Sequence, residues 1–538
     1  MWSLSPSAQT DVGELRELLR RPAAQPESFA QLLLRRLALH GEPAALPVVL
    51  DALQKGVCRP LAAAAIHRLL MELPPGDLPH LERVFGRAYG WLCSSEVTKK
   101  DVAGAAGFGA HRTAVLGLLS LHRNGHVRHE ALAELGRVHS GDELRFLLLR
   151  LNDWVEPIHR DARELVQQRL ASDYLEHFLA ALPLVVRLMA CRRRDLRDLV
   201  VGLVESLVGS GLLEQAFAHR DRDSSRCVAE LAMTTAGVDR QKLVEIGLRS
   251  SDPVIRLRYA RFAKGSPPEA ALEACGQMLG DRFMPVRREG LLLKAELCPE
   301  LRDEIWCACL FDRSRSLREL ARFQLRGFKI DIADVYRRAV SESEADWIAV
   351  AGLAETGDES DLPLFRELLG SSSCRIRAQA VVGLGRLGSE QDRDRLAASL
   401  RDSSSRVAGE AARQILSQPA NVGPEYWEQL LTDDLPDHGG RVILRIVFGL
   451  GRWASLPTLL RVAATGRPAL AQYADKMLEL WSTPPRSLRI FTRPTDRQRQ
   501  QLLEALADAR QSLRPKLLAE LFVWLTACGL VPPPRKSL

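Results

Sequence analysis

The densest group of possible metal ligands in the chain is the stretch LHRNGHVRHE, which holds His122, His126 and His129. His126 and His129 lie one helical turn apart, so both could bind one metal ion if a third ligand came close. The stretch does not complete the two-histidine motif of zinc peptidases, because Ala133 stands where the second histidine would be. An Asn-Gly pair also favours a turn, where exposed histidines are ordinary. We expect no metal and no cofactor, and the sequence leaves metal binding by this cluster open.

A glycine-rich stretch, GLGRLG (383–388), fits the G-x-G-x-x-G pattern of dinucleotide-binding loops. That motif needs a strand before it and a helix that starts inside it. Here a helical pattern of apolar residues comes before the glycines, and the same two glycine positions recur in GLGRW (449–453). The stretch therefore predicts a packed helix that stops at Gly388 and no nucleotide site.

Other signatures of catalysis are missing from the sequence, which has no Walker lysine loop, no G-x-S-x-G elbow and no paired Cys/His pattern. We therefore expect no enzyme. The densest basic run, CRRRDLRDL (191–199), places Arg193 and Arg197 on one helix face, with Arg192 and Arg194 pointing away from it. A solvated face is predicted there, and contact with an anionic partner is the alternative. The other arginines are spread along the chain, which argues against a single phosphate-binding face.

The length and composition set the class of protein. At 538 residues the chain exceeds one compact core, which indicates several domains or an elongated repeat array. The ten cysteines include no CxxC pair, as is usual where thiols stay reduced. The first residues lack the basic and then apolar pattern of a signal peptide. No apolar run approaches the ~18 residues needed to cross a bilayer. We expect a cytoplasmic protein with no membrane span.

The elements that position these residues follow a repeated phrase. In LRDSSSRVAGEAARQIL (400–416), Val407, Ala411 and Ile415 are four apart and form one stripe of a helix, after a Ser-rich turn at Asp402. The phrase recurs, often at a spacing of 31 residues, with stripes that start at Val127, Ile158, Val228, Ile255, Val286, Leu317, Ile348, Ile376 and Val442. A unit of that length holds two helices of about a dozen residues with their turns.

An aspartate at the turn and an arginine after the first stripe residue accompany many copies of the phrase. The arginines are Arg128, Arg256, Arg287, Arg318 and Arg377. An aspartate there can cap the N–H groups at the helix start. The arginine can bridge to the carboxylate of a neighbouring unit, so we interpret both as structural rather than ligand-binding.

The stretch RIRAQAVVGLGRLGSEQDRDRLAASLRDSSSRV (375–407) resembles a HEAT repeat, and closely resembles the short bacterial type named for phycobilisome lyases. The resemblance covers roughly residues 110–480. It implies an all-α fold, a right-handed α-solenoid of stacked helix pairs that is elongated and curved. We expect an N-terminal helical region with degenerate repeats over 1–100 and the repeat array over 101–484. A helical cap over 485–530 and a disordered tail over 531–538 would follow.

Helical solenoids bind partners with the surface that the second helix of each unit lines. The position six residues after a stripe start faces away from the stripe, and it holds Arg261, Leu292, Phe323, Ala354, Val382 and Arg413. Apolar side chains on such a face are what a partner helix or peptide would contact. The alternative is that the phase is off by one residue and that these side chains belong to the core.

We therefore expect a non-enzymatic scaffold or adaptor that binds a protein partner with this surface. The alternative is a nucleic-acid-binding protein related to the HEAT-like DNA alkylpurine glycosylases, in which Arg261 and Arg413 would contact phosphates. Leu292 and Phe323 interrupt such a phosphate track. A bilin lyase or chaperone-type subunit is a third hypothesis, implied by the family name alone. The sequence specifies neither the partner nor the oligomeric state.

Overall fold

The computed structural model describes residues 4–21, 27–92, 98–170, 172–190, 195–235, 238–341, 346–417, 423–482 and 493–531. Every regular element in these residues is a helix and none is a strand, so the predicted all-α solenoid of stacked helix pairs is confirmed. The chain divides into two units, residues 1–299 and 300–538. Of the predicted tail, residues 532–538 lie outside the described part.

The first unit has a core cluster that runs from Val12 to Leu293 and crosses the boundary expected near residue 100. Its helices are α1 (Pro6–Arg20), α2 (Glu27–His40), α3 (Leu46–Gln54), α4 (Arg59–Met71), α5 (Leu78–Leu92), α6 (Lys99–Gly104), α7 (Arg112–Leu119), α8 (Gly125–Gly136), α9 (Leu144–Arg150), α10 (Glu156–Gln167), α11 (Leu175–Ala180), α12 (Leu182–Met189), α13 (Arg197–Gly209), α14 (Leu213–Phe217), α15 (Arg222–Thr234), α16 (Arg240–Arg249), α17 (Pro253–Phe262), α18 (Pro268–Leu279) and α19 (Met284–Leu297).

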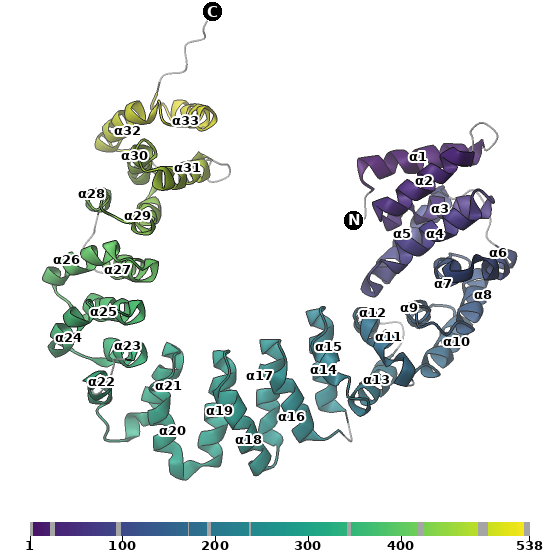
Figure 1. Ribbon diagram of the computed structural model, residues 1–538, viewed down its shortest axis with the longest axis horizontal. Helices are drawn as coiled ribbons and strands as arrows, with labels where there is room; N and C mark the ends of the chain where they lie inside the picture. Colours follow the sequence, from purple (N-terminus) through teal and green to yellow (C-terminus); the bar gives the residue numbers. More distant parts are fainter. Residues whose placement is uncertain are drawn as a thin grey trace, which may run out of the picture. The chain divides into compact units, whose positions relative to one another are not determined.

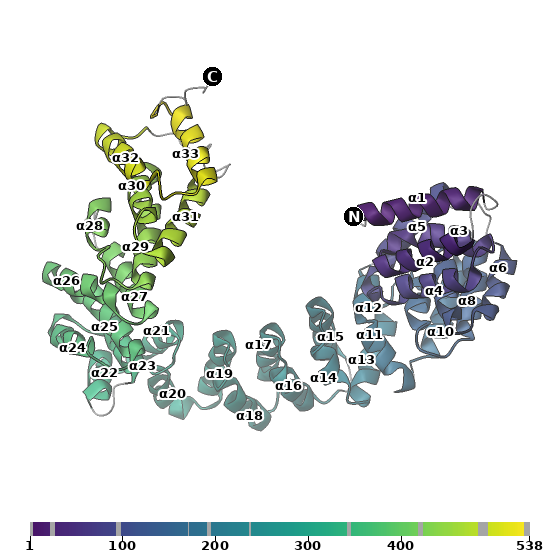
Figure 2. The same cartoon turned by 45° about the horizontal axis from the view of Figure 1, so that its top comes forward.

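The second unit stacks helix pairs in two layers. Its helices are α20 (Arg302–Cys309), α21 (Arg315–Gln324), α22 (Ile332–Ser341), α23 (Trp347–Thr356), α24 (Leu362–Leu368), α25 (Cys374–Leu387), α26 (Glu390–Ala398), α27 (Ser405–Ser417), α28 (Pro424–Gln429), α29 (Asp437–Gly449), α30 (Arg452–Ala463), α31 (Pro468–Ser482), α32 (Asp496–Ala509) and α33 (Pro515–Ala527). In both Figure 1 and Figure 2, α22, α24, α26 and α28 lie along one side and α23, α25, α27 and α29 along the other. We call the first helices of the pairs the A layer, which consists of α20, α22, α24, α26 and α28. The second helices form the B layer, which consists of α21, α23, α25, α27 and α29.

The predicted stripes are the buried faces of the B-layer helices. In α27, Val407, Ala411 and Ile415 are all buried, and the small Ala411 lies in the middle of the stripe. Ala380 in α25 and Ala321 in α21 hold the same middle position and are also fully buried. The packing of one helix face against the neighbouring helices thus recurs in each repeat, as the 31-residue spacing of the stripes predicts.

Successive helix-pair repeats are joined by arginine–aspartate pairs, which confirms the structural interpretation of the aspartate and arginine positions in the repeated phrase. The guanidinium of Arg377 in α25 donates from Nε and Nη2 to the two carboxylate oxygens of Asp402, at 2.7 and 2.8 Å. Asp402 also caps its own turn, because its Oδ1 accepts the Ser404 N–H at 2.7 Å. The same arrangement joins Arg128 to Asp153, Arg226 to Asp252 and Arg256 to Asp281.

Aromatic rings packed on glycines bring the two helices of a pair together. A Cβ at Gly383 in α25 would lie 2.6 Å from the ring of Phe365 in α24, so only glycine fits against that ring. A Cβ at Gly352 in α23 would lie 2.1 Å from the ring of Tyr336 in α22. The Tyr336 hydroxyl donates to the Leu310 carbonyl oxygen at 2.7 Å, which satisfies its only buried polar group.

One stretch in the described residues, 100–119, is long and apolar enough to cross a membrane by length and composition alone. The sequence-based expectation of no such stretch is corrected to that extent. Its backbone is interrupted at Gly109, which adopts φ 52° and ψ −124°. Its last part, α7, contributes Val115 and Leu118 to the core cluster of the first unit.

Candidate functional site

A groove crosses four consecutive B-layer helices of the second unit, α21, α23, α25 and α27. Its volume is about 510 Å³. The residues that line this B-layer groove are Arg313, Arg315, Arg318, Trp347, Ala351, Glu355, Gln379, Val382, Glu410, Arg413, Gln414 and Ser417. Because each repeat contributes its B-layer helix at the same place in the stack, stacking alone places these side chains in a row.

The carboxylate of Glu355 is the electrostatic centre of the groove and joins α21 to α23. Arg318 donates to it through a short contact, and Arg322 donates at 2.7 Å. The guanidinium of Arg315 lies 3.9 Å away and its side chain is mostly exposed. One nearly buried carboxylate thus neutralises part of an arginine cluster and leaves Arg315 available to solvent.

Trp347 and two small apolar side chains form the apolar part of the groove. Trp347 is the first residue of α23, after the Asp346 cap, and the Arg375 guanidinium lies 5.7 Å from its ring centroid. Ala351 in α23 and Val382 in α25 line the groove beside it. The ring therefore lies between the groove and a cation, where a ligand side chain could stack on it.

A second hollow lies between α27 and α29, with a volume of about 540 Å³. The residues that line this α27–α29 hollow are Gly409, Ala412, Arg413, Leu416, Val442, Arg445, Ile446, Gly449 and Leu450. Leu416 is 48% exposed and Leu450 is 39% exposed, so the hollow has two leucines open to solvent. Arg413 lines both the groove and the hollow, so the two adjoin at its side chain.

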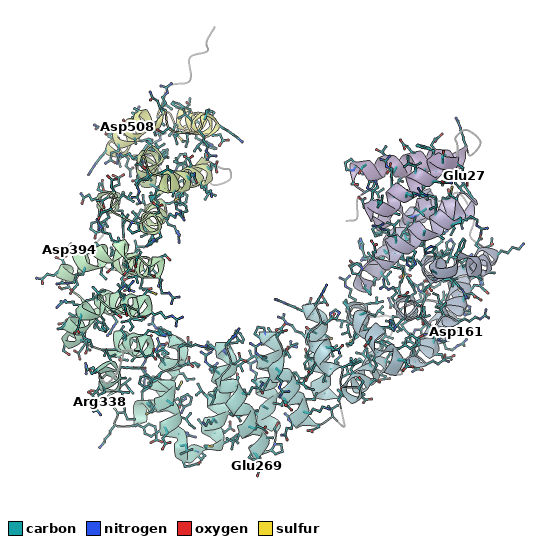
Figure 3. All side chains as sticks on the ribbon, viewed as in Figure 1. Glu27, Asp161, Glu269, Arg338, Asp394 and Asp508 are labelled. Atoms are coloured by element: carbon teal, nitrogen blue, oxygen red, sulfur yellow. The ribbon has the colours of Figure 1, made fainter. Side chains whose placement is uncertain are left out.

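The charge of the second unit differs between its layers. The five B-layer helices carry ten arginines and four carboxylates, a net formal charge of +6. The five A-layer helices carry six arginines and nine carboxylates, a net of −3. Arg338 and Asp394 are labelled on the A-layer side in Figure 3. The helices of the B layer thus hold more arginine than those of the A layer, although Arg318 and Arg377 are nearly buried in ion pairs.

The five predicted site residues fall in two groups. Arg261 and Leu292 belong to the first unit, where Arg261 pairs with Glu289 at 3.1 Å and Leu292 is half-buried in α19. Phe323, Val382 and Arg413 belong to the second unit. Val382 and Arg413 line the B-layer groove, whereas Phe323 is 58% exposed beside Arg326 and does not line it.

Ala354, which the sequence placed on the same exposed line, is fully buried. The buried row of α23 contains Ala349 and Leu353, so its stripe does not start at Ile348 and the predicted phase was wrong there. The residue of α23 that stands where Val382 stands in α25 is Ala351, 31 positions earlier, and both line the groove.

Sequence reasoning missed Trp347, Leu416 and Arg445. Trp347 had a usable signal, because an aspartate cap directly before an aromatic residue marks the start of α23 and therefore an end-of-helix position that packing does not bury. The hollow that exposes Leu416 depends on the separation of α27 and α29, which no local pattern encodes.

The histidine cluster does not form a ligand set. Burial, and then the nearby Arg123 and Arg128, lower the pKa of His122 to about 4. The Nδ1 of His122 accepts the Asn124 N–H at 3.1 Å. His129 instead pairs with Asp161 at 2.7 Å, and His126 is exposed. Across the part of the chain that the structure describes, no group of three His, Cys, Asp or Glu side chains is placed to hold a metal ion.

The two remaining motifs behave as packing elements or lie outside the described residues. Gly383 and Gly385 lie inside α25, which ends at Leu387, and Gly388 follows it, so the predicted helix stop is confirmed. In the basic run, residues 191–194 lie outside the described part, and this includes Arg193. Arg197 is described and pairs with Asp195.

The repeat geometry agrees with a comparison with protein families, in which residues 338–417 match HEAT repeats. This stretch is therefore similar to HEAT repeats. It contains α23, α25 and α27, the three helices that contribute most of the residues lining the B-layer groove. Among curated proteins, none matches the chain.

Solved structures with a similar arrangement include two of the karyopherin Kap121p. The complex with the extreme C-terminus of the phosphatase Cdc14p is 12% identical with a TM-score of 0.33, and 98% of this chain aligns with 66% of that one. The complex with Nup53p is 11% identical with a TM-score of 0.34, over 98% and 65% of the two chains. The chain therefore spans about two thirds of the length of these structures.

Proposed function

We propose that this protein is a non-enzymatic scaffold that binds a protein partner along the B layer of its second unit. The observation that carries the proposal is that the B-layer groove and the adjoining α27–α29 hollow are lined by five consecutive B-layer helices. Extended surfaces of this kind are how helical solenoids bind long segments of their partners. The phycobilisome-lyase subtype and the cytoplasmic location remain predictions of the sequence.

The composition of the groove favours a protein over a nucleic acid. Glu355 and Glu410 lie between the arginines, where they would repel a continuous phosphate backbone. Trp347 is the one aromatic side chain that lines the groove in the described residues, so a strand of bases has no row of rings on which to stack. Mixed polar groups around an apolar floor are instead typical of protein interfaces.

Quantitative affinity capture from cells that produce the protein tests the proposal. The bait variants are Val382→Glu, which puts a charge into the groove, and Arg338→Glu, a control on the exposed A-layer side. We expect a set of proteins that the wild type and the control enrich and Val382→Glu does not, with melting temperatures nearly unchanged. Enrichment that is equal for all three baits, or the capture of nucleic acid in their place, would refute the proposal.

The predicted exposed line is tested in the same experiment. Phe323→Ala removes a largely exposed ring, so we expect little effect on melting and a loss of capture if the partner extends over α21. Leu292→Ala addresses the first unit separately, because the two residues belong to different units.

A further inference from the structure

We propose that the α27–α29 hollow binds an acidic amphipathic helix of the partner protein, with its apolar side chains in the hollow and its carboxylates against the surrounding arginines. This inference rests on the proposed function and names the chemistry of the partner. It follows from three features of the hollow, which are its apolar walls, its open glycine positions and the net positive charge of its lining.

The walls of the hollow present two apolar rows at helical spacing. Val442, Ile446 and Leu450 are four residues apart and form one row on α29, while Ala412 and Leu416 form the other on α27. The exposed leucines stand at the end of each row. A groove between two helices with such rows suits the apolar stripe of a third helix, whose contacts recur at three and four residues.

The glycines of the hollow differ from those that pack the helix pairs. A Cβ at Gly383 or Gly352 would overlap an aromatic ring, because a side chain of the protein itself fills that space. A Cβ at Gly409 or Gly449 would find no atom within 4 Å, so these positions border open space. Together with the exposed leucines, the open positions show that no described side chain fills the hollow.

The charge around the hollow selects a negative partner. Arg413 and Arg445 line the hollow, and no described carboxylate lines it. Arg413 pairs with Glu410 on its own helix, and Arg445 donates to the Tyr473 hydroxyl at 3.4 Å, with no ion-pair partner among the described residues. Arg406 lies two turns before Arg413 on α27, and Arg441 lies one turn before Arg445 on α29. Both are exposed and have no ion-pair partner among the described residues.

These features together exclude the simpler occupants. A phosphate backbone would pair with the arginines but would leave Leu416 and Leu450 in water, and no described aromatic side chain lines the hollow for stacking. A neutral apolar helix would cover the leucines but gain nothing from the four arginines. An amphipathic helix with glutamates beside its leucines satisfies both groups, and its charge would speed association at low salt.

Fluorescence anisotropy with synthetic peptides and the full chain tests the inference. The probe is a labelled peptide of roughly 18 residues, about five helical turns, with leucines at i, i+3, i+4 and i+7 spacing and glutamates on the flanks. The comparison probes are the same peptide with lysine for glutamate, the same peptide with serine for leucine, and a labelled single-stranded oligonucleotide. We expect saturable binding of the first probe alone, weakened by added salt.

Two double variants and two controls locate the binding site. Leu416→Ser with Leu450→Ser removes the apolar contacts, and Arg413→Glu with Arg445→Glu reverses the charge. We expect each to weaken binding of the acidic peptide by at least about tenfold, since anchors of an interface dominate its affinity. The charge-reversed protein should bind the lysine peptide in exchange. Leu503→Ser in α32 and Arg338→Glu in α22, both exposed in the structure, should change nothing.

Other outcomes would overturn the inference. Equal binding of the glutamate and lysine peptides would remove the charge argument, and unchanged binding by both double variants would remove the site. A preference for the oligonucleotide would assign the arginines to nucleic acid. Sedimentation that depends on protein concentration and is lost with Leu416→Ser would assign the hollow to a second copy of the chain. If capture still depends on Val382 while the peptide does not bind, the proposed function stands and this inference fails.

Discussion

Replacing Arg377 by glutamine removes one complete link between two repeats. Its guanidinium makes two hydrogen bonds to Asp402 and two more, at 2.9 and 3.1 Å, to the carbonyl oxygens of Ser371 and Ser372. The Arg377 and Asp402 side chains are only 14% and 13% exposed. An exposed pair contributes about 1 kcal/mol or less, and breaking a buried one costs about 3–5 kcal/mol. We therefore expect a cost of about 2–3 kcal/mol.

That loss should be local, because each repeat contacts only its neighbours. Hydrogen exchange followed by mass spectrometry measures it directly. Amides of α25 and α27 that exchange through separation of these helices should exchange roughly 30- to 150-fold faster, since 1.4 kcal/mol is a factor of ten. Peptides from α31 should be unchanged. The control is Arg375→Gln, two residues earlier, whose guanidinium only lies over the Trp347 ring and should contribute about 0.5–1 kcal/mol. Equal effects of the two substitutions, or an increase along the whole chain, would show that the ion pair does not join the repeats.

Three further outcomes follow from the packing and the ion pairs. Ala380→Glu places a carboxylate at a fully buried helix crossing, so the melting temperature of the second unit should fall sharply, at a cost of several kcal/mol; melting like the wild type would contradict the helix phase. Hydrogen bonds from arginines hold the pKa of both Asp402 and Asp392 below the usual range. Because the pKa is lower in the folded state, each carboxylate stabilises the fold at pH values above the unfolded-state pKa of about 4, and this stabilisation is lost as the pH falls through the folded-state pKa. The melting temperature should therefore decline below about pH 4. Asp402→Asn should make that decline smaller. Gly383→Ala should lower the free energy of unfolding, because overpacking costs about 1–3 kcal/mol and alanine regains only roughly 1 kcal/mol in a helix. The melting temperature should fall accordingly, and Phe365→Leu should restore it.

The fold was predictable because its determinants recur locally. The stripe at Val407, Ala411 and Ile415, the cap at Asp402 and the arginine of the preceding repeat all follow from positions within one repeat or its neighbour. Each fixes a helix start or a buried face without knowledge of the rest of the chain. For the same reason the phase failed in α23, where the sequence WIAVAGLAET is apolar on almost every side and gives no unique buried row.

The candidate surface was predictable only in part. The sequence placed Val382 and Arg413 on the groove because α25 and α27 have clear stripes, and the positions opposite a stripe line the groove. The hollow beside Leu416 could not be found in this way. It depends on how far α29 lies from α27, a distance set by side chains from several helices at once. The basic B layer was also hidden, because alternate helices contribute the charge and a linear scan averages it with the acidic A layer.

The aromatic rings that pack on glycines constrain how this sequence can change over generations. Alanine at Gly383 destabilises the fold while Phe365 keeps its ring, and a smaller residue at 365 would leave an empty volume beside Gly383. Either single substitution is therefore penalised, and only the two together preserve the packing. Homologous chains should consequently exchange both positions of such a pair or neither, and the same coupling should appear between 336 and 352. Sequence divergence in this repeat array would then proceed by paired steps at these crossings, while the open glycines at 409 and 449 vary independently.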